Sequence, residues 1–319
     1  MKAFVTGAGG YIGLDLIKGL LDGGHEVRGL ARNPARLHNL TDLGVEAVLG
    51  DIRHPETISG LLDGMDVIFH LAGTMVGNER NIYRTNVEGT RTLVDAAAAA
   101  GLKTFVLASS GTVYGEHGDE PVTEESDCHP VMAYGRSKLE AERIVMNEAK
   151  VGFSGVICRL GGVYGPRSQM LMLENAGRTQ VRLVGRGHNW VSAIHVEDAS
   201  AALLAAAERG RSGEIYNIVD NEPVQLKDFY NYLAYRLGAP EAKHISEATA
   251  RRLARIVGFF GRLTGKAVVF NADFVKMILS SLRLSNEKMR RELGVELKYP
   301  NYRSGIDAIL QELGVGAAV

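Results

Sequence analysis

The amino-acid sequence predicts an α/β protein with a doubly wound parallel sheet and a smaller, mostly helical C-terminal lobe. Three observations lead to this prediction. Short apolar runs alternate with amphipathic segments through the first 165 residues, which is typical of parallel strands joined by helices. The runs are continuously apolar, as in strands that are covered on both faces. A glycine-rich turn, TGAGGYIG, directly follows the first run.

The predicted elements follow one another regularly up to Pro166. The strands are expected in the runs KAFVTG, EVRGLAR, EAVLGD, DVIFHLAG, KTFVLASS and GVICRLGGVYG. Helices are expected between most of them, in segments such as GLDLIKGLLDGG and GTRTLVDAAAAAG. Beyond Pro166 the pattern is less regular, and from about Glu241 to the segment SNEKMRRELG it is mostly helical.

The composition fits a globular protein and argues against several other classes. Hydrophobic residues make up 45% of the 319 residues, and charged residues 23%. The net charge of −1 gives no basic field that would attract nucleic acid. No apolar run has the roughly 18 residues of a membrane span, so no stable membrane insertion is expected. Cys128 and Cys158 have no metal-ligand spacing and are too few for a disulfide framework, so we predict no metal site and a reducing, cytoplasmic location.

The glycine-rich turn has the spacing of a phosphate-binding loop. Gly7 would allow the tight turn after the strand. Gly10 would let the backbone approach a pyrophosphate, and Gly13 would let the helix pack closely on the strand. The pyrophosphate would lie at the N-terminus of the helix, where free N–H groups and the helix dipole favour an anion. The alternative is a glycine-rich turn without a ligand, which the strand before it and the helix after it make less favourable.

The end of the second strand bears on the choice of cofactor. NAD-specific sites usually have an acidic residue there, and this chain has Ala31 and Arg32. Arg32 would pair with the 2′-phosphate of NADP, so NADP is preferred and NAD remains possible; a solvated surface arginine is the alternative. Asp51, after the third strand, would accept a hydrogen bond from the adenine amino group, or serve equally well as a helix N-cap.

Two further motifs contain residues suited to proton transfer. Tyr134 and Lys138 form a YxxxK pattern in a segment rich in helix formers, so their side chains share one helix face. The pKa of a phenol is ordinarily near ~10, and a neighbouring ammonium and a nicotinamide cation would lower it toward the range useful for acid–base catalysis. The segment ASSGTVYG ends the fifth strand, where Ser110 would donate a hydrogen bond to a substrate oxygen; Ser109 and Thr112 are nearby polar candidates.

These motifs, together with HLAG and RLGGVYGP, occur in one order and each in its β/α context. In this the chain resembles the extended short-chain dehydrogenase/reductases, the NAD-dependent epimerase/dehydratase-like family. The resemblance covers residues 1–238 and, more weakly, SNEKMRRELG. It implies a Rossmann-like dinucleotide-binding domain over residues 1–165, to which segments at about 190–220 return, and a substrate-binding lobe formed mainly by residues 166–319.

The resemblance also assigns roles to residues. Tyr134 would be the general acid/base, Lys138 would bind the nicotinamide ribose and lower the pKa of the tyrosine, and Ser110 would assist at the substrate oxygen. Thr74, Thr112 and Gly162 would face the substrate with Ser110. The cofactor would contact Gly7, Gly10, Tyr11, Ile12, Gly13, Arg32, Asp51, Ile52, Leu71, Ala72, Gly73, Tyr134, Lys138, Gly161 and Val163. Many members form homodimers through two helices per subunit, here the helices near NVEGTRTLVDAA and GRSKLEAERIV, so a homodimer is expected.

The chain departs from the members that act on nucleotide-sugars. They commonly have an asparagine before VYGP and an arginine before IHV, both facing a diphosphate, where this chain has Gly162 and Val191. Burying a dianion without such partners costs free energy, so a nucleotide-sugar is a less favoured substrate. Four arginines of the lobe could compensate: Arg167, Arg178, Arg182 and Arg186. The Asp-Glu pair of sugar 4,6-dehydratases would fall at Gly111 and Thr112, so dehydration is not expected.

The lobe segment RRLARIVGFFGRLTGKAVVF mixes arginines with large apolar residues: Ile256, Val257, Phe259, Phe260 and Leu263. They could form an apolar substrate pocket or a helix that contacts a membrane, but ordinary helix packing is the favoured interpretation. The Arg32 position and the altered diphosphate contacts at Gly162 and Val191 resemble the members that are like 3β-hydroxysteroid dehydrogenase and dihydroflavonol reductase.

Three functional hypotheses result. The first is an NAD(P)-dependent oxidoreductase that interconverts a secondary alcohol and a ketone on a small, non-nucleotide substrate, for which an apolar body is one option. The second is a nucleotide-sugar epimerase with transient hydride transfer to tightly bound NAD(P). The third is a non-catalytic dinucleotide-binding redox sensor, against which the presence of Ser110, Tyr134 and Lys138 argues.

Overall fold

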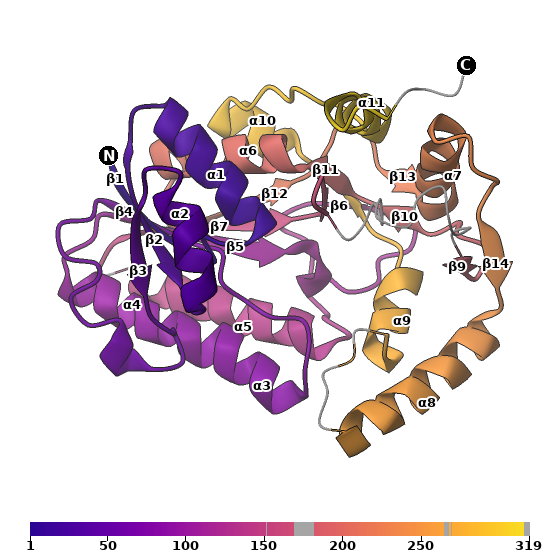
Figure 1. The fold of residues 1–319 in the computed structure, drawn as a ribbon, viewed down its shortest axis with the longest axis horizontal. Coiled ribbons are helices and arrows are strands. Elements are labelled where there is room, and N and C mark those ends of the chain that lie inside the picture. Colours follow the sequence, from indigo (N-terminus) through magenta and orange to yellow (C-terminus); the bar gives the residue numbers. More distant parts are fainter. Residues whose placement is uncertain (151, 169–181, 265–267, 269, 316–319) are drawn as a thin grey trace.

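The computed structural model of the chain describes residues 1–150, 152–168, 182–264, 268 and 270–315. Seven parallel strands form one sheet in the order β12-β7-β5-β4-β1-β2-β3 (Figure 1). Their bounds are β1 Lys2–Thr6, β2 Glu26–Ala31, β3 Glu46–Leu49, β4 Val67–His70, β5 Thr104–Ser110, β7 Ser154–Leu160 and β12 Glu214–Ile218. The chain builds outward from β1 to β3 and then returns to β4 on the other side of β1. This reversal opens a crevice at the carboxyl ends of β1 and β4, and the predicted fold class is confirmed.

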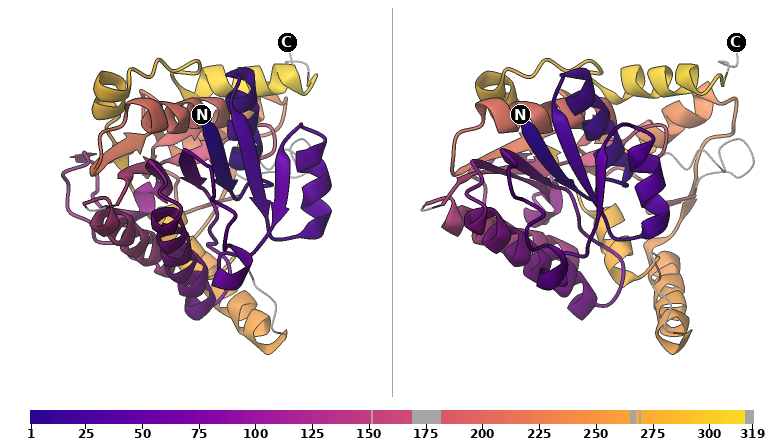
Figure 2. Two further views of the ribbon diagram at one scale, coloured as in Figure 1. Left: turned by 90° about the vertical axis from the view of Figure 1, so that its left-hand side faces the viewer. Right: turned by 60° about the vertical axis from the view of Figure 1, so that its left-hand side comes forward.

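Helices cover both faces of the sheet, as Figures 1 and 2 show. One layer contains α1 (Tyr11–Asp22) and α6 (Val196–Arg209), and the other contains α3 (Glu79–Tyr83), α4 (Gly89–Ala99) and α5 (Ala133–Glu148). Successive residues of β1 pack into the hydrophobic cores on opposite faces of the sheet. Val5 packs with Leu16 and Ile17 of α1, and Phe4 packs with Leu93 of α4. Strands covered on both faces need apolar residues throughout, which explains their continuous apolar runs.

One predicted strand differs from the structure. The run GVICRLGGVYG is divided at Gly161, and only β7 belongs to the large sheet; β8 (Gly162–Tyr164) leaves it and pairs with β11 (Ala193–His195). A Cβ atom at Gly161 would overlap the carbonyl oxygen of Ser192, so the chain can turn away here only with glycine. Cys158, expected in a buried strand, is fully buried in β7.

The remaining elements lie at the carboxyl end of the sheet and around it. Three further strand pairs are short: β10 (Trp190–Val191) with β13 (Val224–Gln225), β9 (Arg182–Val184) with β14 (Lys243–Ile245), and β6 (Pro121–Val122) with β15 (Arg283–Leu284). The other helices are α2 (Leu37–Thr41), α7 (Leu226–Arg236), α8 (Glu247–Thr264), α9 (Ala272–Leu279), α10 (Glu287–Leu293) and α11 (Tyr302–Glu312). The segment at about 190–220 supplies β12 to the large sheet and α6 to one of its helix layers, and α10 packs on α6. The division into two domains stays a prediction.

Helix α8 does not pack as the sequence suggested. Its face toward the protein includes Ala250 and Ala254, both fully buried, which pack with α9. The larger apolar side chains point outward: Leu253, Ile256, Phe259 and Phe260 are 44%, 53%, 54% and 59% exposed. The expectation of ordinary helix packing is therefore wrong for Ile256, Phe259 and Phe260, because small residues occupy the packed face; Val257 is partly buried, and the side chain of Leu263 lies outside the described part of the structure.

The packing of α11 against β8 can be tested by comparing two helix glycines whose surroundings differ. At Gly305 in α11 a Cβ atom would overlap the Tyr164 ring, whereas at Gly258 in α8 it would meet nothing within 4 Å. We expect Gly305→Ala to lower the free energy of unfolding by roughly 1–3 kcal/mol through overpacking. Gly258→Ala should leave it unchanged or raise it slightly, because alanine favours helix. Denaturant titration measures both, and equal effects would contradict the close approach of α11 to β8.

Candidate active site

The glycine loop forms one wall of the crevice. Gly7 has a φ of 68°, and a Cβ atom there would lie 2.9 Å from the backbone nitrogen of Ala72. A Cβ atom at Gly13 would overlap the carbonyl oxygen of Gly7. Helix α1 begins after Gly10, which provides no side-chain cap, and its first turn has no acidic residue. Open N–H groups and a glycine cradle are what a pyrophosphate requires, so these residues fit a dinucleotide.

The segment after β4 forms the neighbouring wall. Leu71, Ala72 and Gly73 follow the strand and approach the glycine loop at Gly7. His70 fixes this corner, since its ring nitrogens lie 2.7 Å from the hydroxyl of Thr6 and 3.0 Å from that of Thr90. Burial lowers the pKa of His70 to about 3, so the ring is neutral and acts as a structural link. The Thr6 hydroxyl also accepts a hydrogen bond from the Ala72 N–H at 3.1 Å.

Arg32 and Asp51 lie beside each other at the outer end of the crevice. Arg32 is exposed just after β2, and its charge contributes to lowering the pKa of Asp51, although hydrogen bonds from Arg53 contribute more. Asp51 accepts from the Arg53 N–H at 3.0 Å and pairs with its guanidinium. The Asp51 side chain caps no helix, since the N-cap of the following turn is His54, so the N-cap alternative is wrong. The Ile52 side chain is buried in the core.

Tyr134 and Lys138 lie one turn apart near the start of α5. Tyr134 is half-buried, and burial raises the pKa of its phenol while a hydrogen bond with Ser110 opposes that effect. Lys138 is buried; burial lowers the pKa of its ammonium group to about 8, and the charge of Glu142 opposes this. Ser110 ends β5, and its Oγ accepts hydrogen bonds from the Thr112 N–H at 3.2 Å and the Thr112 hydroxyl at 3.0 Å. The structure thus brings the three predicted catalytic residues together, with Thr112 beside them.

A buried ion pair links the strands and the helix that carry Ser110, Tyr134 and Lys138. Arg159 of β7 donates two hydrogen bonds to Glu142 of α5, at 3.0 Å and 2.7 Å, and the hydroxyl of Ser109 donates a third. Both charged side chains are only 4% exposed. The Arg159 guanidinium also lies 4.6 Å from the centre of the Tyr114 ring. This pair joins β5, β7 and α5, and the sequence analysis did not identify it because its partners lie in separate motifs.

Asn86 is a second residue that the sequence analysis missed. Its side-chain oxygen accepts from the Thr74 N–H at 2.8 Å, and its amide group donates to the Thr74 carbonyl and the Ser137 hydroxyl, both at 2.9 Å. Asn86 therefore fixes the predicted substrate residue Thr74 against α5. An asparagine inside a helical segment gives no sequence signal of such a role.

The far wall is formed by β8. The hydroxyl of Tyr11, in the first turn of α1, donates to the carbonyl oxygen of Val163 at 2.7 Å, and burial raises the pKa of that phenol. The Gly162 N–H donates to the Ser192 carbonyl, and Val191 lies in β10. Ile12 adjoins Tyr11 in the same turn. Of the arginines considered as substitutes, Arg167, Arg182 and Arg186 are exposed, and Arg178 lies outside the described residues.

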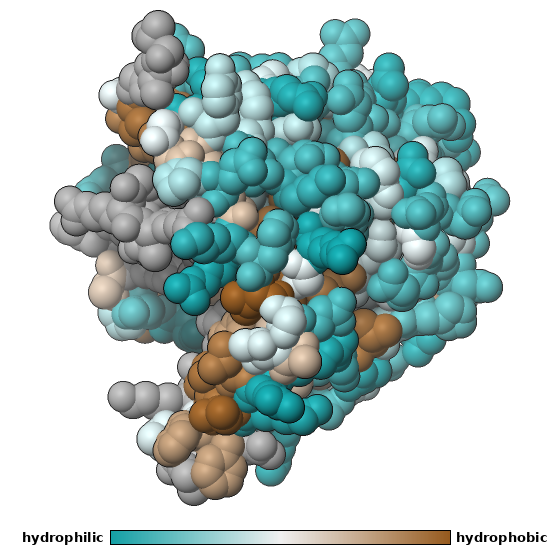
Figure 3. Space-filling model, turned by 90° about the vertical axis from the view of Figure 1, so that its right-hand side faces the viewer, coloured by the Kyte–Doolittle hydropathy of each residue, from teal (hydrophilic) through white to brown (hydrophobic). Residues whose placement is uncertain are grey.

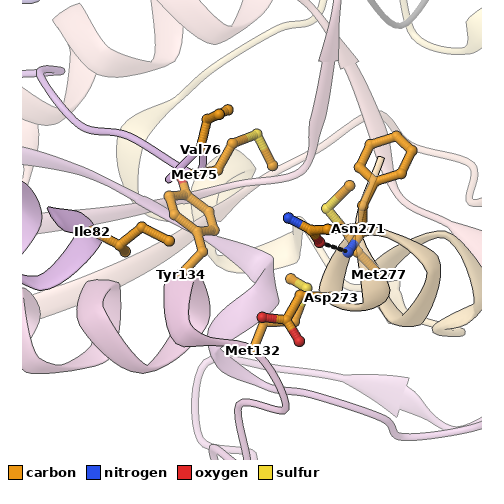
Figure 4. A pocket seen from close by; sticks show the side chains of 9 residues that line it. Met75, Val76, Ile82, Met132, Tyr134, Asn271, Asp273 and Met277 are labelled. Atoms are coloured by element: carbon orange, nitrogen blue, oxygen red, sulfur yellow. Dashed lines mark hydrogen bonds between the residues drawn. The ribbon is translucent and has the colours of Figure 1, made fainter. Parts of the chain in front are cut away.

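A pocket opens beside Tyr134 (Figure 4). From the nucleotide domain it is lined by Met75, Val76, Ile82, Met132 and Tyr134, and from the C-terminal part by Asn271, Asp273, Phe274 and Met277. Asn271 is the N-cap of α9, and its side chain accepts from the Phe274 N–H at 2.9 Å. Of these lining residues, the sequence predicts only Tyr134, since contributions from α9 depend on tertiary packing.

The buried ion pair can be tested against an exposed one on the same helix. Glu142→Gln keeps the shape of the side chain but leaves the Arg159 charge buried without a counterion. We expect it to lower the free energy of unfolding by about 3 kcal/mol or more. Glu140→Gln removes a partly exposed carboxylate that pairs with Arg143 at 3.1 Å, and should change stability by less than about 1 kcal/mol. Similar losses in both variants, measured by denaturant titration, would argue against the assigned role of Glu142.

Comparisons with known proteins agree with this geometry. Residues 3–219 match the NAD dependent epimerase/dehydratase family. A 4-hydroxy-2-methyl-3-oxo-4-farnesyl-3,4-dihydroquinoline-1-oxide ketoreductase of Stigmatella aurantiaca is 30% identical over 98% of this chain and 96% of its own. A decarboxylating sterol-4-alpha-carboxylate 3-dehydrogenase of Dictyostelium discoideum is 24% identical over 97% of this chain and 99% of its own.

The fold has close counterparts among solved structures. A dTDP-glucose 4,6-dehydratase of Bacillus anthracis in complex with NAD superimposes with a TM-score of 0.79 over 98% of this chain and 96% of that one, at 23% identity, which is a likeness of fold. The matched family spans the glycine loop, Ser110, Tyr134 and Lys138. The chain belongs to the NAD-dependent epimerase/dehydratase family, the extended short-chain dehydrogenase/reductases, and is an oxidoreductase-family enzyme.

Proposed function

We propose that this protein interconverts a secondary alcohol and a ketone on an apolar, non-nucleotide substrate, with Tyr134 as general acid/base. One observation supports this most directly: Tyr134 lies in a pocket whose other walls are largely methionine and aliphatic side chains. A pocket of this kind gains free energy by burying hydrocarbon, and flexible methionines adapt to irregular shapes. It offers no cationic side chain to a diphosphate among its lining residues.

The three polar residues divide the proton chemistry. In reduction, the Tyr134 phenol would give its proton to the developing alkoxide, and in oxidation the phenolate would take the hydroxyl proton. Ser110, hydrogen-bonded to Tyr134, would hold the same substrate oxygen. Lys138 would favour the phenolate through its positive charge, which a pKa of about 8 preserves at neutral pH. A bound nicotinamide cofactor accepts or supplies the hydride.

The relatives support an apolar substrate as well. The Stigmatella aurantiaca protein is named as a ketoreductase of a farnesyl-bearing quinoline oxide, and the Dictyostelium discoideum protein as a sterol carboxylate dehydrogenase. Both names describe redox chemistry on compounds that are largely hydrocarbon. We infer that this chain acts on the same broad class, a ring or chain ketone with an apolar body.

We further propose NADP as the preferred cofactor and a homodimer as the working assembly. Arg32 is exposed after β2, and the carboxylate of nearby Asp51 is paired with Arg53, which leaves the arginine open to a phosphate. For the dimer, α4 and α5 form an outer layer of the nucleotide domain, and Ala96, Ala98 and Ala99 offer small side chains for close helix approach.

Removal of the Tyr134 hydroxyl tests the reaction. Tyr134→Phe should reduce kcat for a ketone by roughly 10²–10⁴-fold, because the proton donor is lost, while cofactor affinity changes little. Tyr235→Phe, at an exposed tyrosine of α7, is the matched control and should behave as the wild type. Turnover that survives unchanged in Tyr134→Phe would contradict the proposed role.

The substrate class is tested by a thermal-shift panel with cofactor present, comparing steroid and flavonoid ketones with UDP-sugars. Stabilisation by the apolar ketones, followed by cofactor oxidation in an absorbance assay, is expected. Stabilisation by UDP-sugars alone, without net cofactor consumption, would favour an epimerase instead.

The cofactor preference is tested at Arg32. Arg32→Ala should weaken NADPH binding about 10–100-fold, the loss expected for a charge-assisted contact with phosphate, and leave NADH binding nearly unchanged. Arg290→Ala, at an exposed arginine of α10, controls for overall charge. Isothermal titration measures both cofactors, and equal weakening of NADH and NADPH would refute the assignment.

A further inference from the structure

Helix α8 has the features of a surface that binds lipid. It has 18 residues, and its small residues Ala250 and Ala254 face the protein while Leu253, Ile256, Phe259 and Phe260 face outward. Figure 3 shows hydrophobic side chains gathered over this projecting end of the molecule and continuing toward α9. We name this surface the α8 face, defined by those four exposed apolar residues. Large apolar side chains placed outward in preference to inward require a partner to cover them.

The charges of α8 identify the kind of partner. The helix sequence has four arginines, at 251, 252, 255 and 262, against one glutamate, Glu247, in a chain whose net charge is −1. Glu247 pairs with Arg251 at 3.5 Å, while Arg252 and Arg255 are exposed and have no ion-pair partner among the described residues. An exposed apolar strip flanked by arginines matches a bilayer surface, with hydrocarbon below the strip and anionic headgroups beside the arginines.

Other partners fit less well. A second copy of α8 would bring the same arginines and no excess of acid to the α8 face. A transmembrane arrangement is not available, since none of the helices in the described part of the chain is long and apolar enough to cross a bilayer. Figures 1 and 2 show α8 at the edge of the molecule, projecting beyond the sheet.

We propose that α8 docks this protein peripherally onto the surface of anionic lipid bilayers, through the α8 face and the adjoining arginines. Helix α8 packs on α9, and α9 contributes Phe274 and Met277 to the pocket beside Tyr134. Docking would therefore place the pocket close to the lipid. If the proposed function also holds, an apolar substrate could pass from the bilayer to the pocket, but the docking itself does not depend on that reaction.

The test is co-sedimentation of the full-length protein with vesicles of phosphatidylglycerol and phosphatidylcholine, and with pure phosphatidylcholine vesicles. The wild type should bind the anionic vesicles, and less at high salt. Phe259→Ser/Phe260→Ser should lower the partition coefficient at least about tenfold, since it removes the inserted rings. Arg252→Ser/Arg255→Ser should abolish the preference for anionic lipid. Tyr235→Ser, which removes an exposed aromatic ring from α7, is the matched control and should bind as the wild type.

Three outcomes would overturn the proposal. In the first, the wild type fails to bind anionic vesicles. In the second, the wild type and Phe259→Ser/Phe260→Ser bind them equally. In the third, that variant converts a dimer to a monomer and no vesicle binding is seen. Turnover of a water-soluble ketone without vesicles separates this result from the proposed function. The α8 variants should retain that turnover, because none of their substituted residues lines the pocket.

Discussion

The buried pair of Glu142 and Arg159 is the interaction on which the candidate site depends. Glu142 lies one helical turn after Lys138, and Arg159 lies in β7 next to β5, the strand that ends in Ser110. Their two hydrogen bonds hold the middle of α5 against the carboxyl end of β7. A buried carboxylate and a buried guanidinium each need the other, so this contact fixes α5 in one position and thereby fixes Tyr134 relative to Ser110.

Burial has different consequences for the groups around the crevice. It keeps His70 neutral, so that the ring can link two threonines without adding charge beside the cofactor. It lowers the pKa of Lys138 to about 8, and the negative charge of Glu142 limits that decrease. The same carboxylate thus positions α5 and helps to preserve the lysine charge. Structure and electrostatics are coupled here through one side chain.

The C-terminal part of the chain serves both the pocket and the molecular surface. Helix α9 closes the apolar pocket over Tyr134, while α8 packs on α9 through two alanines and exposes its larger residues. Because the two helices are in contact, a partner that binds α8 would also approach the pocket. The arrangement fits a substrate of low solubility better than a diphosphate-bearing sugar, for which the pocket lining provides no cation.

The family, the doubly wound sheet and the grouping of Ser110, Tyr134 and Lys138 can all be predicted from the sequence alone. These depend on local signals: apolar runs specify strands, glycine spacing specifies a turn, and an i, i+4 pair shares a helix face. Four features become visible only in the folded chain: Asn86 holds Thr74, Glu142 pairs with Arg159, β8 leaves the large sheet, and four large apolar residues of α8 face outward. Each of these depends on contacts between residues far apart in the chain, or on which side of an amphipathic helix packs, and a local pattern contains no information about either.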